Sequence, residues 1–169
     1  MTATTTTPAS TPAADAEDAK PLEAFRNLQA PYDWEDVDTL TYQEGGNTFK
    51  GVSRKLLFDE RARQDNHVRY FEVQPGGWST FGHHWHTHEV IIYRGSGTVL
   101  VGTELRHVKE GDLVYIGPDE WHQLAATDGV SFGFICIIRT EHGKTILPTK
   151  EDLEQIYAEH PELKGHIFA

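Results

Sequence analysis

The chain is poor in cysteine, in basic residues and in long apolar runs: it has one cysteine, and 15 Lys and Arg against 26 Asp and Glu. With Cys136 alone no intrachain disulfide can form, and its neighbours in FGFICII predict a small buried core residue without chemistry. The net charge of −11 leaves no basic patch for nucleic acid or anionic lipid. We therefore expect neither nucleic acid nor membrane among the partners.

No apolar run approaches the roughly 20 residues that cross a bilayer. The N-terminus also lacks the basic and then apolar order of a secretory signal. These two absences predict a cytoplasmic protein. The length of 169 residues fits one domain, which can bury a core without disulfides.

The N-terminal part of the chain differs in composition from its middle. Residues 1–20 are mostly Thr, Ala, Pro and Asp, which cannot offset their ordering entropy by burial, so we predict a disordered tail. In residues 21–49, apolar side chains at Leu22, Phe25 and Leu28 predict a short amphipathic helix followed by a connecting segment.

The segment 50–140 carries short alternating or apolar runs rich in Val, Ile, Tyr and Phe, separated by Gly, Pro and Asp turn signals. The runs recur about every ten residues, as in antiparallel sandwiches and barrels. In the C-terminal extension 141–169, Thr149 and Asp152 form a capping-box pattern. This pattern predicts a helix there, with a role in packing.

The densest chemical signal is a cluster of four histidines within six residues: His83, His84, His86 and His88. On a strand, His84, His86 and His88 would share one face. At about 3.3 Å per residue, however, His84 and His88 would lie roughly 13 Å apart, too far to share an ion. We therefore expect either a turn near Trp85 or a set in which not all of these histidines are ligands.

A separate histidine, His122, follows a strand and a proline turn in EGDLVYIGPDEWHQL and stands at the start of another strand. Imidazole is a common ligand for first-row transition metals, and a metal site needs ligands from separate strands. Two or three of the clustered histidines together with His122 would supply such a site. An affinity tag does not explain the cluster, because a tag lies at a terminus without interleaved Trp and Thr.

In these motifs the chain resembles the cupins, small β-barrels that hold a metal in the barrel mouth. Their first motif, G-x5-H-x-H-x3-E-x6-G, aligned on Gly95, places His88 where the family usually has Glu, as in an all-histidine subgroup. The sequence PGG at 75–77 fits the opening of that motif. The segment GDLVYIGPDEWH resembles a shortened form of the second motif, G-x5-P-x-G-x2-H-x3-N, with Pro118 four residues before His122.

The resemblance covers about residues 50–140. It implies an all-β, single-domain cupin-type β-barrel, also described as a double-stranded β-helix or jelly-roll, with short flanking helices. It further implies a homodimer. We expect one divalent transition metal per chain, Fe(II) first, followed by Mn(II), Ni(II), Cu(II) and Zn(II), because imidazole discriminates little among these ions.

The first motif can be aligned with the sequence in two registers, and each register predicts a different set of metal ligands. In the ungapped register the first histidine of the H-x-H pair falls on Gly82, and the ligands are His84, His88 and His122. If the turn is two residues shorter, His84 and His86 form the pair, and His84, His86, His88 and His122 all coordinate. We expect this second set, because it supplies the full number of four ligands.

Bulky or polar side chains beside the expected ligands are candidates for the wall of a substrate pocket: Phe81, Trp85, Trp121 and Gln123. Arginines on strands usually lie on the solvated face, so we expect Arg54, Arg69 and Arg94 there and not at a substrate. No nucleophile-elbow sequence supports a Ser-His-Asp triad.

These expectations point to a mononuclear metalloenzyme, an oxidoreductase of the non-haem dioxygenase type that uses O2 on a small organic substrate. Neutral histidine ligands leave the ion its full charge, which favours anionic or enolisable substrates that chelate it. The alternative is a non-catalytic cupin that binds a metal or a small ligand as a sensor or storage module, since a fold does not fix a function.

Overall fold

The computed structural model describes residues 21–42 and 48–169, so the tail predicted at 1–20 lies outside the described residues. Its regular structure is almost entirely β. The strands are β1 (Leu28–Ala30), β2 (Asp33–Trp34), β3 (Thr39–Thr41), β4 (Lys50–Phe58), β5 (Asn66–Trp78), β6 (His88–Arg94), β7 (Ser96–Val101), β8 (Glu104–Lys109), β9 (Leu113–Ile116), β10 (His122–Ala126) and β11 (Phe132–Arg139). The helical elements in the described residues are α1 (Lys150–Glu159) and the 3-10 turns Glu60–Ala62 and Pro161–Leu163.

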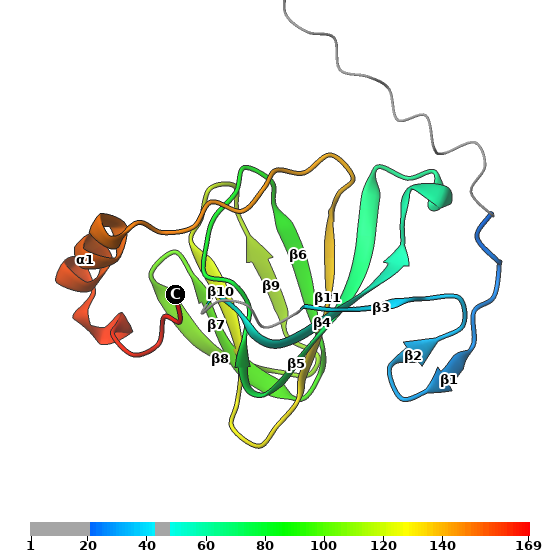
Figure 1. The fold of residues 1–169 in the computed structure, drawn as a ribbon, viewed down its shortest axis with the longest axis horizontal. Helices are drawn as coiled ribbons and strands as arrows, with labels where there is room; N and C mark the ends of the chain where they lie inside the picture. Colours follow the sequence, from blue (N-terminus) through cyan, green and yellow to red (C-terminus); the bar gives the residue numbers. More distant parts are fainter. Residues whose placement is uncertain (1–20, 43–47) are drawn as a thin grey trace, which may run out of the picture.

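Nine strands form one antiparallel sheet that curls into a half-open barrel (Figure 1). The strand order is β8-β7-β10-β5-β11-β6-β9, while β4 pairs with β5 and β3 pairs with β4. The long strand β5 is central to this arrangement, because it pairs with β4, β10 and β11. The predicted all-β barrel is confirmed, and one short α-helix flanks it within the described residues.

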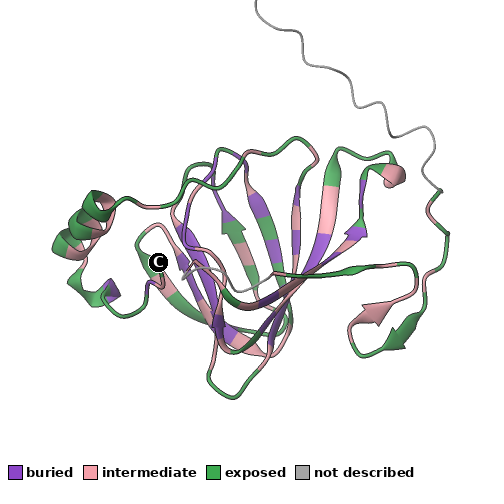
Figure 2. Cartoon of the chain, viewed as in Figure 1, coloured by how far each residue is buried: buried purple, intermediate pink, exposed green. Residues whose placement is uncertain are grey.

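Alternation along the strands builds the interior of the barrel, because successive side chains of a strand point to opposite faces. In β6, His88, Val90 and Ile92 are buried while the residues between them are exposed. In β11, Phe134 and Cys136 are buried. Figure 2 shows buried positions recurring along the strands that enclose the interior. Chemically active side chains and core side chains therefore share the same inward-facing rows.

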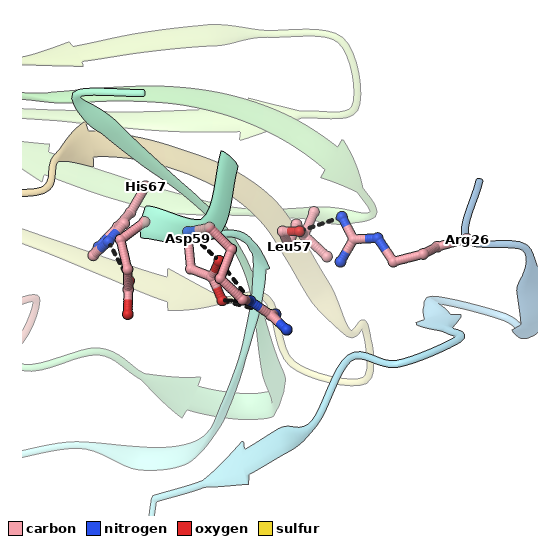
Figure 3. A network of polar contacts seen from close by, with 6 residues as sticks. Arg26, Leu57, Asp59 and His67 are labelled. Carbon is pink, nitrogen blue, oxygen red and sulfur yellow. Dashed lines mark hydrogen bonds and ion pairs between the residues drawn. The ribbon is translucent and has the colours of Figure 1, made fainter. Parts of the chain in front are cut away.

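The helix expected between residues 22 and 28 is absent: this segment has no helical turn and leads into the short strand β1. Its apolar side chains have no partner surface to cover, since Phe25 and Leu28 are 85% and 57% exposed. A few apolar residues without tertiary packing are too few to stabilise so short a helix. Instead, Arg26 donates a hydrogen bond to the Leu57 carbonyl near the end of β4 (Figure 3).

The C-terminal helix α1 begins where the sequence predicts. Thr149 caps it, and Thr149 and Asp152 make both reciprocal hydrogen bonds of a capping box. After α1, Leu163 and Ile167 are buried in a second apolar cluster that includes Phe81. The C-terminal segment is therefore a packing element of the barrel. No helix in the part of the chain that the structure describes is long and apolar enough to span a membrane.

Candidate metal centre and its cavity

Three histidines converge although they come from three different segments. His84 lies in the loop between β5 and β6, His88 begins β6, and His122 begins β10. One ring nitrogen of each lies within 4.8 Å of the others, and all three residues are buried. The loop bends at Trp85 and His86, which agrees with one of the two alternatives expected from the sequence. Because of this bend, His84 reaches His88 instead of lying a strand's length away.

Backbone hydrogen bonds fix this loop against the turn between β9 and β10. Gly82 and His122 form an isolated antiparallel bridge with N···O distances of 3.3 and 2.9 Å. The Asp119 N–H donates to the His84 carbonyl at 2.7 Å. These bonds hold the segment after β5 beside the start of β10, so that histidines from both segments meet.

Gly82 occupies a position with no room for a side chain. A Cβ atom added there would lie 2.4 Å from Cγ2 of Thr145 and 2.7 Å from the Ile146 carbonyl oxygen. The segment after β11 crosses this position, and His83 and Ile146 form a second bridge there. We call residues 142–146 the strap, because they follow β11 in the chain and cross the histidine loop.

The imidazoles of His84 and His122 are oriented by backbone carbonyls. His84 Nδ1 lies 3.2 Å from the His86 carbonyl oxygen, and His122 Nδ1 lies 2.8 Å from the Glu120 carbonyl oxygen. A carbonyl oxygen can only accept a hydrogen bond, so both Nδ1 atoms carry the proton. Both Nε2 atoms therefore keep a lone pair that is available to a metal.

His88 supplies the third nitrogen. Its Nδ1 lies 3.0 Å from the Cys136 sulfur, and its Nε2 lies 2.8 Å from Nε2 of His84. Two nitrogen ligands bound at about 2.1 Å from an ion and at right angles lie about 3 Å apart, so this pair has the spacing of neighbouring ligands. The donor set and its spacing fit a transition metal, and the cluster of His84, His88 and His122 indicates a metal site.

Burial keeps these imidazoles neutral. Loss of hydration is the largest cause, and it lowers the pKa of His88 to about 2, the pKa of His122 to about 4, and the pKa of His84 below its usual range. The neighbouring histidines add to the effect at His88. Since a metal binds the neutral imidazole, no proton has to leave before metal binding at neutral pH.

The hydrogen-bonding roles of the two ring nitrogens are reversed in His86. Its Nδ1 accepts a hydrogen bond from the Gly143 N–H at 3.2 Å, so the proton of the neutral ring is on Nε2. The ring stacks on His84 with 3.7 Å between centroids and does not join the three converging nitrogens. The structure thus groups three of the four expected ligands and leaves His86 beside them.

The histidine cluster faces a cavity of about 470 Å³ inside the barrel. Its polar lining consists of imidazoles, cations, hydroxyls and one thiol: His84, His86, His88, His122, His142, Arg54, Arg69, Lys144, Tyr42, Ser79, Thr80, Thr145 and Cys136. None of the described residues that line it carries a carboxylate. In a chain of net charge −11, the cavity is therefore a local concentration of positive charge.

The four side chains that the sequence places in the pocket wall lie outside this lining. Phe81 and Trp121 stack on each other at 5.2 Å between centroids and belong to the second apolar cluster, which the C-terminal segment covers. Trp85 is 49% exposed. Gln123 is buried, and its amide bonds to the backbone of Phe168.

Two residues line the cavity although their sequence context predicts other places. Arg69 and Cys136 face each other across β5 and β11, and the Arg69 guanidinium donates to the Cys136 sulfur at 3.2 Å. Arg69 is only 9% exposed, so the expected solvated position is wrong. Cys136 is buried as predicted, but its sulfur contacts His88 and lines the cavity. Strand alternation is the one sequence signal that places both residues inside.

Known proteins resemble this chain over most of its length. A family model described as Cupin domain matches residues 69–138. The 1-methylthio-D-xylulose 5-phosphate methylsulfurylase of Rhodospirillum rubrum is 40% identical over 146 residues, which cover 86% of this chain and 91% of that protein.

Solved structures agree with this similarity. A cupin 2 conserved barrel domain protein from Rhodopseudomonas palustris superposes with a TM-score of 0.81 at 37% identity, covering 86% of this chain and 100% of that chain. A cupin-2 domain structure from Rhodospirillum rubrum gives a TM-score of 0.73 at 40% identity, over 80% of this chain and 91% of that chain.

The methylsulfurylase contradicts the function expected from the sequence. Its name describes sulfur chemistry on a sugar phosphate, so the expectation of a dioxygenase-type oxidoreductase is wrong. The error has a physical origin. Histidine motifs indicate that a metal is held, but they do not specify a reaction, and no motif marks the other cavity-lining groups such as the Cys136 thiol and the Arg69 guanidinium.

Proposed function

This chain belongs to the cupin family, and on that premise we propose that it is a metal-dependent enzyme that cleaves the carbon–sulfur bond of a methylthio-substituted ketose phosphate. The Rhodospirillum rubrum relative supports the substrate class, because its name describes a 2-ketose with methylthio at C1 and phosphate at C5. The cavity offers a suitable partner for each functional group of such a substrate. The thiol suits the sulfur, the metal site suits the ketone, and the cations suit the phosphate.

The observation that carries the proposal is the position of Cys136. Its sulfur lines the same cavity as the histidine cluster and lies 3.0 Å from Nδ1 of His88. A thiol is the protein group suited to attack another sulfur atom, because exchange at sulfur proceeds through a mixed disulfide. Cys136 is the only cysteine of the chain. We therefore assign it as the acceptor of the methylthio group.

His84, His88 and His122 would hold the metal through their Nε2 atoms. A divalent ion bound there would polarise the substrate carbonyl and stabilise negative charge on its oxygen. This role does not need a redox-active ion, so the proposed function does not favour Fe(II) over the other ions. Fe(II), Mn(II), Ni(II), Cu(II) and Zn(II) all suit a set of neutral imidazoles.

The transfer of the methylthio group to Cys136 needs no oxidant or reductant besides the substrate and the thiol. A bond forms between the Cys136 sulfur and the methylthio sulfur, while the C1–S bond breaks and leaves its electron pair on C1. The thiol gives up one proton and C1 takes up one, so the products are a 1-deoxy ketose phosphate and a methyl disulfide on Cys136. Carbon is reduced and sulfur is oxidised. A small thiol then exchanges with this disulfide and restores Cys136.

Two donors position the sulfur for this step. Arg69 donates to it at 3.2 Å, and Nδ1 of His88 lies 3.0 Å from it on another strand. Burial raises the pKa of the Cys136 thiol, and the Arg69 guanidinium opposes this shift by favouring negative charge on the sulfur. The Cys136 sulfur is buried, and low-dielectric surroundings strengthen these interactions.

A single-turnover reaction tests the proposal. The metal-loaded protein is mixed with 1-methylthio-D-xylulose 5-phosphate in the absence of any added thiol. We expect one equivalent of 1-deoxy-D-xylulose 5-phosphate and one methylthio group on the peptide that contains Cys136, detected by mass spectrometry. A small thiol added afterwards should release that group and permit further turnover.

The matched control is Cys136→Ser, which should retain metal and form no product. Product from this variant would overturn the role of Cys136. A wild-type protein that holds metal and forms no product would overturn the proposed function.

A further inference from the structure

Resting on the proposed function, we infer that Arg54 and Arg69 form an anion site on the β4–β5 wall of the cavity, which binds the phosphate of the substrate. Both residues line the cavity. Arg54 is half-buried, and Arg69 is 9% exposed. A long cationic side chain is almost never buried without a partner, so the pair requires an explanation.

The strand register places both guanidinium groups on one face. Arg54 is opposite Phe71, and Leu56 is opposite Arg69, so the two arginines are diagonal neighbours across β4 and β5. Diagonal neighbours on one face of an antiparallel pair lie about 7–8 Å apart. Two side chains of this length can bind one anion between them. Arg69 is held in place by Phe71, whose ring centre lies 5.1 Å from its Cζ.

Neither arginine is neutralised within the described part of the chain. The Arg69 Nε is buried and has no hydrogen-bond partner there, while one of its two terminal nitrogens, Nη2, donates to the Cys136 sulfur. Arg54 has no hydrogen bond or ion pair with a described residue. By contrast, Arg94 pairs with Glu72 at 2.6 Å. Burying a cation without a counter-ion costs free energy, so a bound anion would stabilise the two guanidinium groups on this wall.

The shape of the guanidinium group favours phosphate as that anion. Its planar fork binds two phosphate oxygens at once, and such charge-assisted pairs are the strong ones. No carboxylate among the described lining residues competes for the arginines or repels a dianion. Arg69 and Arg54 could therefore share the oxygens of one phosphate group.

The position of the pair matches a substrate with sulfur at one end and phosphate at the other. Arg69 lies directly opposite Cys136, whereas Arg54 is one pair of residues further along the strands, opposite Phe71. The anion site thus begins beside the thiol and extends away from it. A phosphate bound there would set the distance between the anchored end of the substrate and its reacting end.

The test is a calorimetric titration of the metal-loaded full chain with inorganic phosphate. Arg54→Gln should weaken phosphate binding at least about tenfold, as expected for the loss of a charge-assisted hydrogen bond. Arg54→Lys keeps the charge without the fork and should retain part of the affinity. The control is Arg106→Gln, the same change of charge at an exposed side chain of β8, which should bind phosphate like the wild type.

Kinetics separate this inference from the proposed function. With 1-methylthio-D-xylulose 5-phosphate, Arg54→Gln should raise KM at least about tenfold, and this loss should shrink when the substrate lacks its phosphate. If phosphate binding depends on Arg54 but no methylthio sugar reacts, the anion site stands and the proposed function falls. Equal phosphate affinity in wild type and Arg54→Gln, or no phosphate binding by the wild type, overturns the inference whether or not turnover occurs.

Discussion

Nδ1 of His88 lies 3.0 Å from the sulfur of Cys136, and this contact joins the metal cluster to the single thiol of the chain. The opposite nitrogen of the same ring faces His84. One imidazole therefore contacts both the metal position and the proposed sulfur acceptor. The partner of a ligand histidine fixes its tautomer and orientation, so a change at Cys136 should also act on the metal.

Replacing Cys136 with Ala should reduce metal affinity about 10- to 100-fold, because His88 loses the partner of its Nδ1. Cys136→Ser should lose less, since a hydroxyl oxygen can accept the same hydrogen bond. Competition with a coloured chelator measures both affinities. If Cys136→Ala binds metal as tightly as the wild type, the contact does not orient His88.

Replacing His122 with Ala should remove most of the metal bound at one equivalent, because His122 alone brings a nitrogen from β10 to the cluster. Metal analysis after gel filtration gives the stoichiometry. His107→Ala is the control, since His107 is exposed on β8. Equal metal content in the two variants would contradict the assignment of His122.

His84→Ala and His86→Ala should differ. His84 presents a free Nε2 lone pair, whereas the Nδ1 of His86 is engaged by the Gly143 N–H. We expect His86→Ala to keep one equivalent of metal and His84→Ala to lose it, measured by the same metal analysis. Loss of metal from both variants would show that the ring of His86 turns and that four histidines coordinate.

Gln123→Ala should lower the free energy of unfolding by about 1–3 kcal/mol, because it leaves buried backbone groups without partners. The Gln123 amide donates to the carbonyls of Ser79 and Phe168 and accepts from the Phe168 N–H. Urea denaturation measures the loss, and the metal content should stay at the wild-type level. Unchanged stability together with a raised KM would instead place Gln123 at the substrate.

The strands and the starts of two elements could be predicted because they depend on short-range patterns, whereas the barrel is implied by the resemblance to the cupins, since the periodicity suits a sandwich equally well. Alternating apolar residues predict the strands, the turn before His122 predicts the start of β10, and Thr149 with Asp152 predicts the start of α1. A straight strand would hold His84 and His88 too far apart to share an ion, so the bend at Trp85 is one of two expected alternatives. Each of these inferences uses residues only a few positions apart.

The contents of the cavity could not be predicted in the same way. Alternation shows that Arg69 and Cys136 point inward, but it does not show which inward positions face packed core and which face open space. Phe81 and Trp121 stand next to expected ligands, yet a segment much later in the chain covers them. Both outcomes depend on contacts between distant segments. The homodimer implied by the resemblance stays a prediction.

The missing side chain at Gly82 limits how the site can evolve. A histidine at position 82 would add an imidazole in the ungapped register, but the backbone of Ile146 lies where its Cβ would have to be. A lineage cannot reach that arrangement by one substitution, because the strap would first have to be rerouted. Changes in ligand number are therefore more accessible through His86, whose ring already stacks on His84 and whose Nδ1 accepts one hydrogen bond from the Gly143 N–H.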